Sequence, residues 1–409
     1  MREKDLPADG GLRPDAQANG WSHGEEEPSG LRKAVSGHGR RDLREGTARM
    51  DGVLSAARNT LASAGTLLRG RERASGAGRA DGGAFGAARI ASAPRRLGFD
   101  ETVPPNGYAW WYVDAFSADH RFGLTIIAFI GSVFSPYYAK ARRLHDQADP
   151  AQHCSLNVAV YGPGVGRWAM TERCSKALRP SADGLAIGPS AVIWDGSRLH
   201  IEIDEKTPYT LVPLRGTVTL EPEILPDFVT DFGTGGRHRW SPIAPRAHVE
   251  VRLKNPALSW DGTGYFDLNR GAEPIEDGFS YWNWSRACLS RKAAILYDVT
   301  RPESGSASMG LEIAADGTVS QIEAPEYCAL TRTPVWKMPR ETRCDSGHAA
   351  RVVKTFEDAP FYSRSMIATR LLSEPVNAMH ESISLDRFRK RWVQTLLRFR
   401  MPRAPFNCD

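Results

Sequence analysis

Short strand-like runs recur between about residue 96 and residue 372, and this pattern constrains the fold more than any other feature. The runs are alternating or wholly apolar and are separated by turn residues, as in YAWWYVDAF, LNVAVYG, HVEVRL and AAILYDV. Between them there is no helical pattern of the roughly ten to fifteen residues that βαβ units require. The pattern therefore predicts an all-β fold made of antiparallel barrels or sandwiches.

Two Asp-Gly pairs mark hairpins within this region. Asp195-Gly196 lies between AVIW and RLHIEI, and Asp316-Gly317 lies between LEIAA and TVSQI. Asp-Gly between alternating runs is a strong short-range hairpin signal. The longest apolar run, Gly123 to Phe134, is shorter than the roughly twenty residues of a spanning helix, so it predicts a buried strand.

The chain of 409 residues is longer than one core usually supports, which favours two domains, or one large domain plus extensions. Residues 1–96 are rich in Gly, Ala, Arg, Ser and Glu, so we expect a disordered extension there. The proline-containing run SPIAPRA suggests a connector, and we place a boundary there. The predicted parts are an N-terminal domain at 97–243, a C-terminal domain at 244–375, and a helix and tail at 376–409.

Near the C-terminus the pattern becomes helical. Apolar residues recur at steps of three or four, with arginine and lysine between them, at Leu385, Phe388, Trp392, Leu396 and Phe399. The spacing predicts a short basic amphipathic helix. Two roles remain open: a helix packed on the β body with a solvated basic face, or an interfacial helix attracted to anionic lipid.

Composition excludes several classes of function. The net charge of +5 is too small for a typical nucleic-acid binder, so no nucleic-acid partner is expected. The six cysteines form no CxxC or CxxH pair, so no metal site is expected, and no GxGxxG or P-loop implies a nucleotide cofactor. Met1 is followed by charged residues without an apolar segment, which predicts no secretory signal, a reducing compartment and no disulfides.

The segment DGTGYFDLNRG (261–271) carries the strongest candidate site. In an extended strand Tyr265 and Asp267 share one face, and a carboxyl among aromatic rings has a raised pKa and can act as a general acid. His238 and Trp240 lie about thirty residues upstream and could join it if the segments pack together. Trp240 and Tyr265 would then stabilise a cation, while His238 would orient the carboxyl or hold water. The alternative is that Asp267 only caps a turn.

Two aromatic groups could line a pocket for a long apolar ligand. Strand alternation puts three rings of the first group on one face, and a second group follows the candidate acid; the rings are Tyr108, Trp110, Tyr112, Trp282 and Trp284. An ordinary core would use the same residues. A carboxylate pair among Glu273, Glu276 and Asp277 could support glycoside hydrolysis, although a charged, proline-containing loop favours a solvated surface.

Several long motifs occur in the order of a known family. They are PPNGYAWWYVDA, GLTIIAFIGSVFSPYYA, LNVAVYGPGVGRWAMTER, HRWSPIAP, GYFDLNRGAEPIEDGFSYWNWSRA, WVQ and FRMPR. From about residue 100 to 403 the chain resembles the carotenoid 1,2-hydratases, also called hydroxyneurosporene synthases. The resemblance implies two tandem lipocalin-like barrels or half-barrels, and cofactor-independent addition of water to the C1,2 double bond of acyclic carotenoids such as neurosporene and lycopene.

The resemblance also implies roles for single residues. Asp267 within GYFD would protonate the alkene, with Tyr265 in the same motif and His238 and Trp240 within HRW as the other catalytic residues. The expected partners are the carotenoid and water, with peripheral contact to lipid on the cytoplasmic side of a photosynthetic or inner membrane. The alternative function is a non-catalytic, lipocalin-like carrier of isoprenoid lipid, which needs the aromatic wall but no acid.

Overall fold

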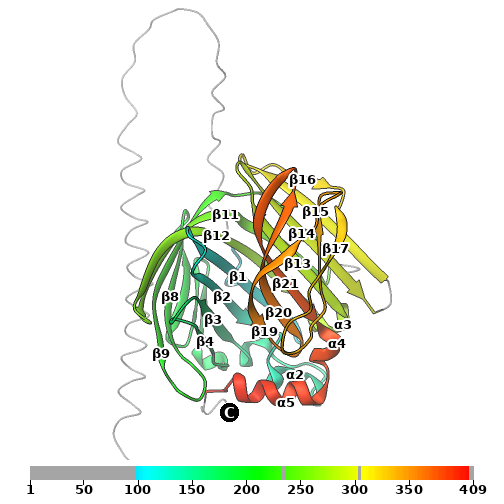
Figure 1. The fold of residues 1–409 in the computed structure, drawn as a ribbon. Helices are drawn as coiled ribbons and strands as arrows, with labels where there is room; N and C mark the ends of the chain where they lie inside the picture. The colour runs from blue at the N-terminus through cyan, green and yellow to red at the C-terminus, as the bar shows by residue number, and fades with distance from the viewer. Residues whose placement is uncertain (1–96, 233–235, 303–304, 405–409) are drawn as a thin grey trace, which may run out of the picture. The chain divides into compact units, whose positions relative to one another are not determined.

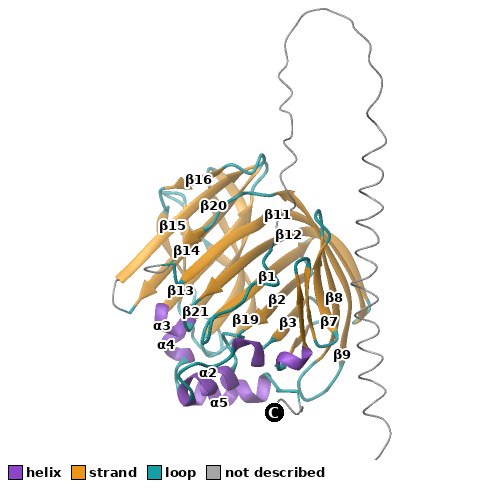
Figure 2. Cartoon of the chain, turned by 180° about the vertical axis from the view of Figure 1, so that it is seen from behind, coloured by secondary structure: helices purple, strands orange, loops and turns teal. Residues whose placement is uncertain are grey.

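The computed structural model describes residues 97–232, 236–302 and 305–404 (Figure 1). The extension predicted at 1–96 lies outside these ranges. The described part of the chain consists mainly of antiparallel strands, so the predicted all-β class is confirmed (Figure 2). The described residues all belong to one compact unit.

The larger sheet is built by the first part of the described chain. Its strands are β1 (Tyr108–Ser117), β2 (Gly123–Ile130), β3 (Ser155–Tyr161), β4 (Arg167–Met170), β5 (Leu178–Ser181), β6 (Gly184–Ile187), β7 (Ser190–Trp194), β8 (Leu199–Lys206), β9 (Pro213–Ile224), β10 (Thr230–Asp231), β11 (His238–Asn255) and β12 (Leu258–Gly271). Their order is β4-β3-β2-β1-β12-β11-β9-β8-β7-β6-β5, with β10 paired to β11. The sheet curls like half of a barrel (Figure 1).

A second sheet follows in the sequence. Its strands are β13 (Tyr281–Cys288), β14 (Lys292–Arg301), β15 (Gly305–Ala314), β16 (Val319–Ile322), β19 (Arg351–Asp358), β20 (Tyr362–Leu371) and β21 (Glu374–Ser384). They pair in the order β16-β15-β14-β13-β21-β20-β19, while β17 (Glu326–Leu330) and β18 (Arg340–Cys344) form a separate hairpin. The prediction of two tandem antiparallel units is therefore confirmed.

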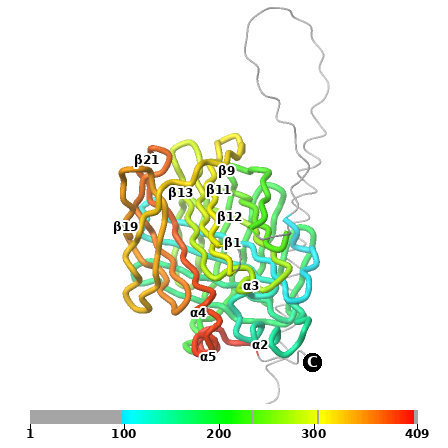
Figure 3. The backbone as a smooth tube through the Cα atoms, turned by 90° about the vertical axis from the view of Figure 1, so that its right-hand side faces the viewer, coloured from blue at the N-terminus to red at the C-terminus, as the bar shows by residue number. Residues whose placement is uncertain are grey.

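A few short helices complete the described chain. They are α2 (Pro136–Leu144), α3 (Ile275–Gly278), α4 (Leu385–Phe388), α5 (Arg391–Arg400) and the 3-10 turns at Pro150–Gln152 and Ser175–Ala177. The predicted C-terminal helix is present but divided between α4 and α5. Figure 3 shows α4 and α5 together with α2 at one end of the sheets, and α5 contacts α2.

The local strand predictions are also confirmed. Asp195-Gly196 connects β7 to β8, which pair through Trp194 and Leu199. Asp316-Gly317 connects β15 to β16. Gly196 and Gly317 have φ values of 98° and 88°, which glycine adopts without steric cost. The first part of the apolar run, Gly123–Ile130, becomes β2, whose residues are all buried, whereas residues 131–134 are not in a strand.

The connector predicted at SPIAPRA is instead part of β11, so the boundary placed between 243 and 244 falls inside a strand. The pairing of β11 with β12 shifts register between Pro242 and Ala244 and again between Ala244 and Ala247. Proline lacks a backbone N–H and is tolerated at such irregularities. The chain passes from the first sheet to the second only after Gly271.

Strand β1 is buried on both faces. Trp111 and Val113 belong to the core enclosed by the curled sheet. Trp110 and Tyr112, on the opposite face, belong to a second core together with rings from the second sheet. Because successive residues of a strand point to opposite faces, one strand serves two cores. The second core lies between the two sheets.

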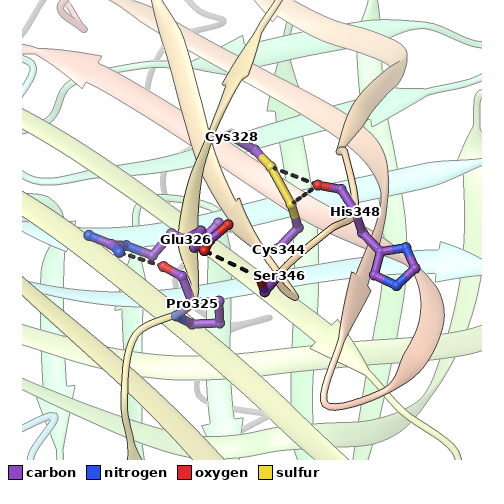
Figure 4. Close-up of a disulfide and its surroundings, with 7 residues drawn as sticks. Pro325, Glu326, Cys328, Cys344, Ser346 and His348 are labelled. Carbon is purple, nitrogen blue, oxygen red and sulfur yellow. Dashed lines mark hydrogen bonds between the residues drawn. A yellow bond between two sulfur atoms is a disulfide. The ribbon is translucent and has the colours of Figure 1, made fainter.

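A disulfide joins Cys328 in β17 to Cys344 in β18, so the prediction of no disulfides was wrong (Figure 4). The two Cα atoms lie 6.4 Å apart, which is within bridging range. Beside the bridge, the Ser346 hydroxyl donates a hydrogen bond to the Glu326 carboxylate at 3.2 Å. The prediction rested only on the expected reducing compartment, whereas the bridge follows from the pairing of the adjacent strands β17 and β18.

A buried ion pair connects the two sheets. The Arg286 guanidinium on β13 donates to both carboxylate oxygens of Asp114 on β1, and Nε lies 3.3 Å from Oδ2. Both side chains are almost completely buried. Burial raises the pKa of Asp114, while the charge of Arg286 opposes that rise.

Arg286→Met should destabilise the protein by about 3–5 kcal/mol, because it leaves the Asp114 carboxyl buried without its partner. Urea unfolding followed by circular dichroism measures the change. The matched control is Arg198→Met, which breaks an exposed pair with Glu221 and should cost at most about 1 kcal/mol. Equal losses in the two variants would contradict the structural role of the buried pair.

Candidate active site

Asp267 lies on β12 with its carboxyl facing the second sheet. Its Oδ2 accepts hydrogen bonds from Trp240 Nε1 at 2.9 Å and from the Tyr265 hydroxyl at 2.7 Å. Its Oδ1 accepts one from Asn269 Nδ2 at 3.1 Å. The side chain of Tyr265 shares a face with Asp267, as strand alternation predicts, and Trp240 comes from the paired strand β11.

The environment of Asp267 favours the protonated acid. Burial raises the pKa of this carboxyl to about 7, although the hydrogen bonds from Trp240 and Tyr265 act in the opposite direction. The negative charges of Glu381 and Asp114 add to the rise. Because Oδ2 already accepts two hydrogen bonds, the proton of the acid form is best placed on Oδ1. The group can therefore donate a proton near neutral pH.

Asp267 borders a cavity of about 330 Å³ between the two sheets. The aromatic side chains that also line it include Trp110, Tyr112, Trp282, Trp284 and Tyr297. The first two belong to the larger sheet and the other three to the second sheet. Tyr108, the remaining ring predicted to bind substrate, does not line this cavity. It stacks on Trp110 instead, with ring centroids 4.7 Å apart.

Strand register explains which side chains meet in the cavity. Residues directly opposite one another on neighbouring strands point to the same face. In the larger sheet one such row contains Asp267, Tyr112, Ile127 and Asn157. In the second sheet the corresponding row contains Tyr297, Trp284, Glu381 and Arg364. All eight of these side chains line the cavity.

His238 is buried but makes no hydrogen bond to Asp267. Its Nε2 lies 2.8 Å from Glu273 Oε1, and its Nδ1 lies 2.9 Å from the Tyr108 hydroxyl. Since a carboxylate only accepts, Nε2 carries the proton and Nδ1 accepts from Tyr108. Burial lowers the pKa of His238 against the opposing effect of Glu273, which favours this neutral form.

Trp240 and Tyr265 meet Asp267 through their polar atoms, and neither lines the cavity. The structure thus brings three of the four predicted catalytic residues into one hydrogen-bonded group and places His238 behind the aromatic wall. The rings positioned to contact a ligand in the cavity are those that line it. Tyr297, which contacts Trp240 at 4.9 Å between ring centroids, is one of them.

Four residues of the site were missed at the sequence level. Strand alternation could have predicted Asn269, because it follows Asp267 by two positions and so shares its face. Tyr297, Arg364 and Glu381 had no such signal, since they lie in strands without a recognisable motif. They reach the site only through pairing within the second sheet.

The acids considered for glycoside hydrolysis are engaged in ion pairs. Glu273 contacts His238 and Arg237, and Glu276 contacts Arg142 at 2.5 Å. Asp277 contacts Arg389 at 3.3 Å. These ion pairs therefore fix the segment 273–277 and connect it to Arg389, directly after α4. None of the three carboxylates lines the aromatic cavity.

A buried acid whose pKa is raised toward neutrality beside an apolar aromatic cavity suits general-acid chemistry on an apolar ligand. The family model of carotenoid hydratase CrtC matches residues 126–407. The chain belongs to this family, whose enzymes are hydro-lyases.

Known relatives match over nearly the whole chain. An acyclic carotenoid 1,2-hydratase of Thiocapsa roseopersicina is 47% identical, covering 91% of this chain and 92% of that protein. A protein of the same name from Rubrivivax gelatinosus is 43% identical, covering 98% and 100% respectively. The solved structure of kievitone hydratase from Nectria haematococca overlays with a TM-score of 0.46 at 11% identity, covering 72% of this chain and 97% of that one. An overlay this loose says nothing about the reaction.

The raised pKa of Asp267 should make stability depend on pH. Between the unfolded value of about 4 and the folded value of about 7, the folded state keeps a proton that the unfolded state releases, so raising the pH favours unfolding. The stability of the wild type relative to Asp267→Asn should therefore fall by at most about 4 kcal/mol between about pH 4 and pH 8. Urea unfolding of both proteins at each pH measures this difference. A constant difference would contradict the raised pKa.

Proposed function

We propose that this chain adds water to the C1,2 double bond of an acyclic carotenoid such as neurosporene or lycopene, with Asp267 as the proton donor. The observation that carries the proposal is the buried carboxyl of Asp267, whose pKa is raised to about 7 and which borders an aromatic cavity. The names of the relatives from Thiocapsa roseopersicina and Rubrivivax gelatinosus support the choice of substrate.

The reaction begins with transfer of the Asp267 proton to C2 of the terminal double bond. Protonation at C2 leaves the positive charge on C1, which carries two methyl groups and gives the more stable tertiary cation. Water then bonds to C1 and loses a proton, which yields a tertiary alcohol. No oxidation or reduction takes place, so the carboxyl and water are sufficient reactants.

The rings that line the cavity stabilise the cation. An aromatic face attracts a desolvated positive charge by about 2 kcal/mol. The centroid of the Tyr297 ring lies 5.3 Å from that of Trp282 and 6.4 Å from that of Trp284, so these rings form a cluster. Trp240 and Tyr265 act differently from the sequence-based prediction, since they hold the Asp267 carboxyl through hydrogen bonds.

His238 is proposed as a positioning residue. Its hydrogen bond from Tyr108 fixes a ring that stacks on Trp110, and Trp110 lines the cavity. His238 thereby maintains the wall against which the substrate packs. A direct role in holding the attacking water would require His238 to reach the cavity, which it does not line.

Asp267→Asn should reduce hydration of lycopene by roughly a thousandfold, because the amide cannot supply the proton. In the wild type kcat should decline above about pH 7, tenfold per pH unit, as the acid form is lost. Chromatography of the alcohol product measures both effects. Asp298→Asn is the matched control, since Asp298 is buried and paired with Arg343 outside the cavity. Near-wild-type turnover of Asp267→Asn would overturn the assignment.

Incubation with lycopene in oxygen-labelled water, without added cofactor, separates the enzyme from the alternative lipid carrier. Only a hydratase places the label in a carotenoid product. Bound but unlabelled lycopene would favour the carrier.

The cavity opens beside α5, where the surface suits contact with a membrane. Buried Val393 and Leu397 pack α5 on the β body, while an apolar patch is exposed beside them; we define this α5 patch as Trp336, Trp392, Leu396 and Phe399. Leu396 and Trp336 also line the cavity, and Trp336 stacks on Trp392 at 5.7 Å between ring centroids.

Exposed cations surround the α5 patch, at Arg389, Lys390, Arg391 and Arg398. Apolar rings flanked by cations are typical of helices that lie in the interface of an anionic bilayer. None of the helices in residues 97–232, 236–302 and 305–404 is long and apolar enough to cross a bilayer. We therefore propose peripheral contact with anionic lipid through the α5 patch, from which a membrane-dissolved carotenoid enters the cavity.

The double variant Trp392→Ser, Phe399→Ser should weaken binding to anionic vesicles at least tenfold, since each buried ring contributes about 1.5–3 kcal/mol. Neither residue lines the cavity, so hydration of detergent-dispersed substrate should persist. Vesicle cosedimentation measures binding. Tyr209→Ser, Leu211→Ser removes two other exposed apolar residues and serves as the control. Equal vesicle binding by both double variants would contradict the proposed contact.

A further inference from the structure

We propose that Glu381 is a second catalytic carboxylate, which accepts the proton of the attacking water on the opposite side of the substrate from Asp267. The proposal rests on the proposed hydration and names the group that completes it. Glu381 lies on β21 of the second sheet and lines the cavity, although no motif in the sequence marks it.

The Glu381 carboxylate is oriented by hydrogen bonds to one of its two oxygens. Its Oε1 accepts hydrogen bonds from the Tyr112 hydroxyl at 2.7 Å and from Arg364 Nε at 2.8 Å. Arg364 supplies the compensating positive charge and is fixed in turn by a bond to the Tyr161 hydroxyl at 2.6 Å. Within the described ranges no donor bonds to Oε2. This arrangement orients the carboxylate and leaves one oxygen for a ligand.

Asp267 and Glu381 project from facing walls. Asp267 belongs to the row of the larger sheet, next to Tyr112, while Glu381 belongs to the row of the second sheet, between Trp284 and Arg364. Tyr112 links the two, because it lies opposite Asp267 in the register and donates to Glu381. The negative charge of Glu381 also raises the pKa of Asp267.

This geometry assigns one face of the double bond to each carboxyl. When Asp267 delivers its proton to C2 from the first wall, it occupies that face of the substrate. Water then approaches C1 from the second wall, where a carboxylate oxygen is available to orient it. Glu381 is the cavity-lining carboxylate that belongs to the same row as the rings Trp284 and Tyr297.

The atoms balance without a further reactant. The Asp267 Oδ1–H bond breaks as the π electrons form the C2–H bond, which leaves the aspartate ionised and C1 positive. A lone pair of water forms the C1–O bond, and the displaced proton passes to Glu381 Oε2. The products are a tertiary alcohol, an ionised Asp267 and a protonated Glu381, and transfer of that proton through water restores the starting state.

The stereochemistry of the wild-type reaction tests the proposal directly. The substrate is lycopene labelled with deuterium in one of the two methyl groups on C1, in defined geometry, and the reaction is run in heavy water. Chemical syn elimination of the product followed by NMR shows whether deuterium at C2 and oxygen at C1 entered from opposite faces. Facing carboxyls predict anti addition. Syn addition or a mixture would overturn the role of Glu381, whereas the absence of any alcohol would overturn the proposed hydration itself.

Glu381→Gln provides a second test. The amide retains the shape of the side chain but cannot take up the proton, so turnover should fall at least about a hundredfold while lycopene binding changes little. Glu205→Gln is the matched control, because Glu205 is also buried and paired with an arginine, Arg173, but lies outside the cavity. Near-wild-type turnover of Glu381→Gln would overturn the proposal. If that variant does not fold, the stereochemical result on the wild type decides.

Discussion

The burial of the Asp267 carboxyl between two sheets is the constraint on which the rest of the site depends. Removing a carboxyl from water disfavours its charged form, and here that effect exceeds the opposing effect of two donors on Oδ2. If the two donors on Oδ2 were positively charged side chains, the aspartate would stay ionised and could not donate a proton. Neutral donors instead fix the orientation of the carboxyl while leaving its pKa high.

The same burial requires that the second sheet cover the first. Strand β1 shows this most clearly, because Trp111 and Val113 fill the curled sheet while Trp110 and Tyr112 meet the rings of the second sheet. The Asp114–Arg286 ion pair crosses the same interface. A carboxylate on one sheet and its cation on the other restrict how the sheets can slide. The position of the two cavity-lining rows relative to one another thus depends on contacts outside the cavity.

Local features of the sequence predicted the local structure, whereas long-range pairing remained hidden. Alternation placed Tyr265 and Asp267 on one face, and Asp-Gly pairs located two hairpins. The pairing of β1 with β12 joins segments far apart in the chain, and no local pattern encodes it. Glu381 was missed for the same reason, because β21 pairs with the distant strand β13. The Cys328–Cys344 bridge was missed because the prediction rested on the compartment alone, although the bridge joins two adjacent strands. The prolines in β11 suggested a connector because proline is rare inside an uninterrupted strand. The strand accommodates them where its register with β12 is irregular.

A site that adds water within an apolar cavity must admit a water molecule while its acid stays desolvated, because desolvation is what raises the pKa of that acid. The structure separates these needs by position. The ionised pair of Arg364 and Glu381 lies within one row of the second sheet, and the rings of Trp284 and Tyr297 continue that row toward β14. A water held by the proposed base Glu381 would contact charge on one side and aromatic faces on the other. Because Asp267 lies in the other wall among aromatic neighbours, a polar group can hold the nucleophile while the acid remains desolvated.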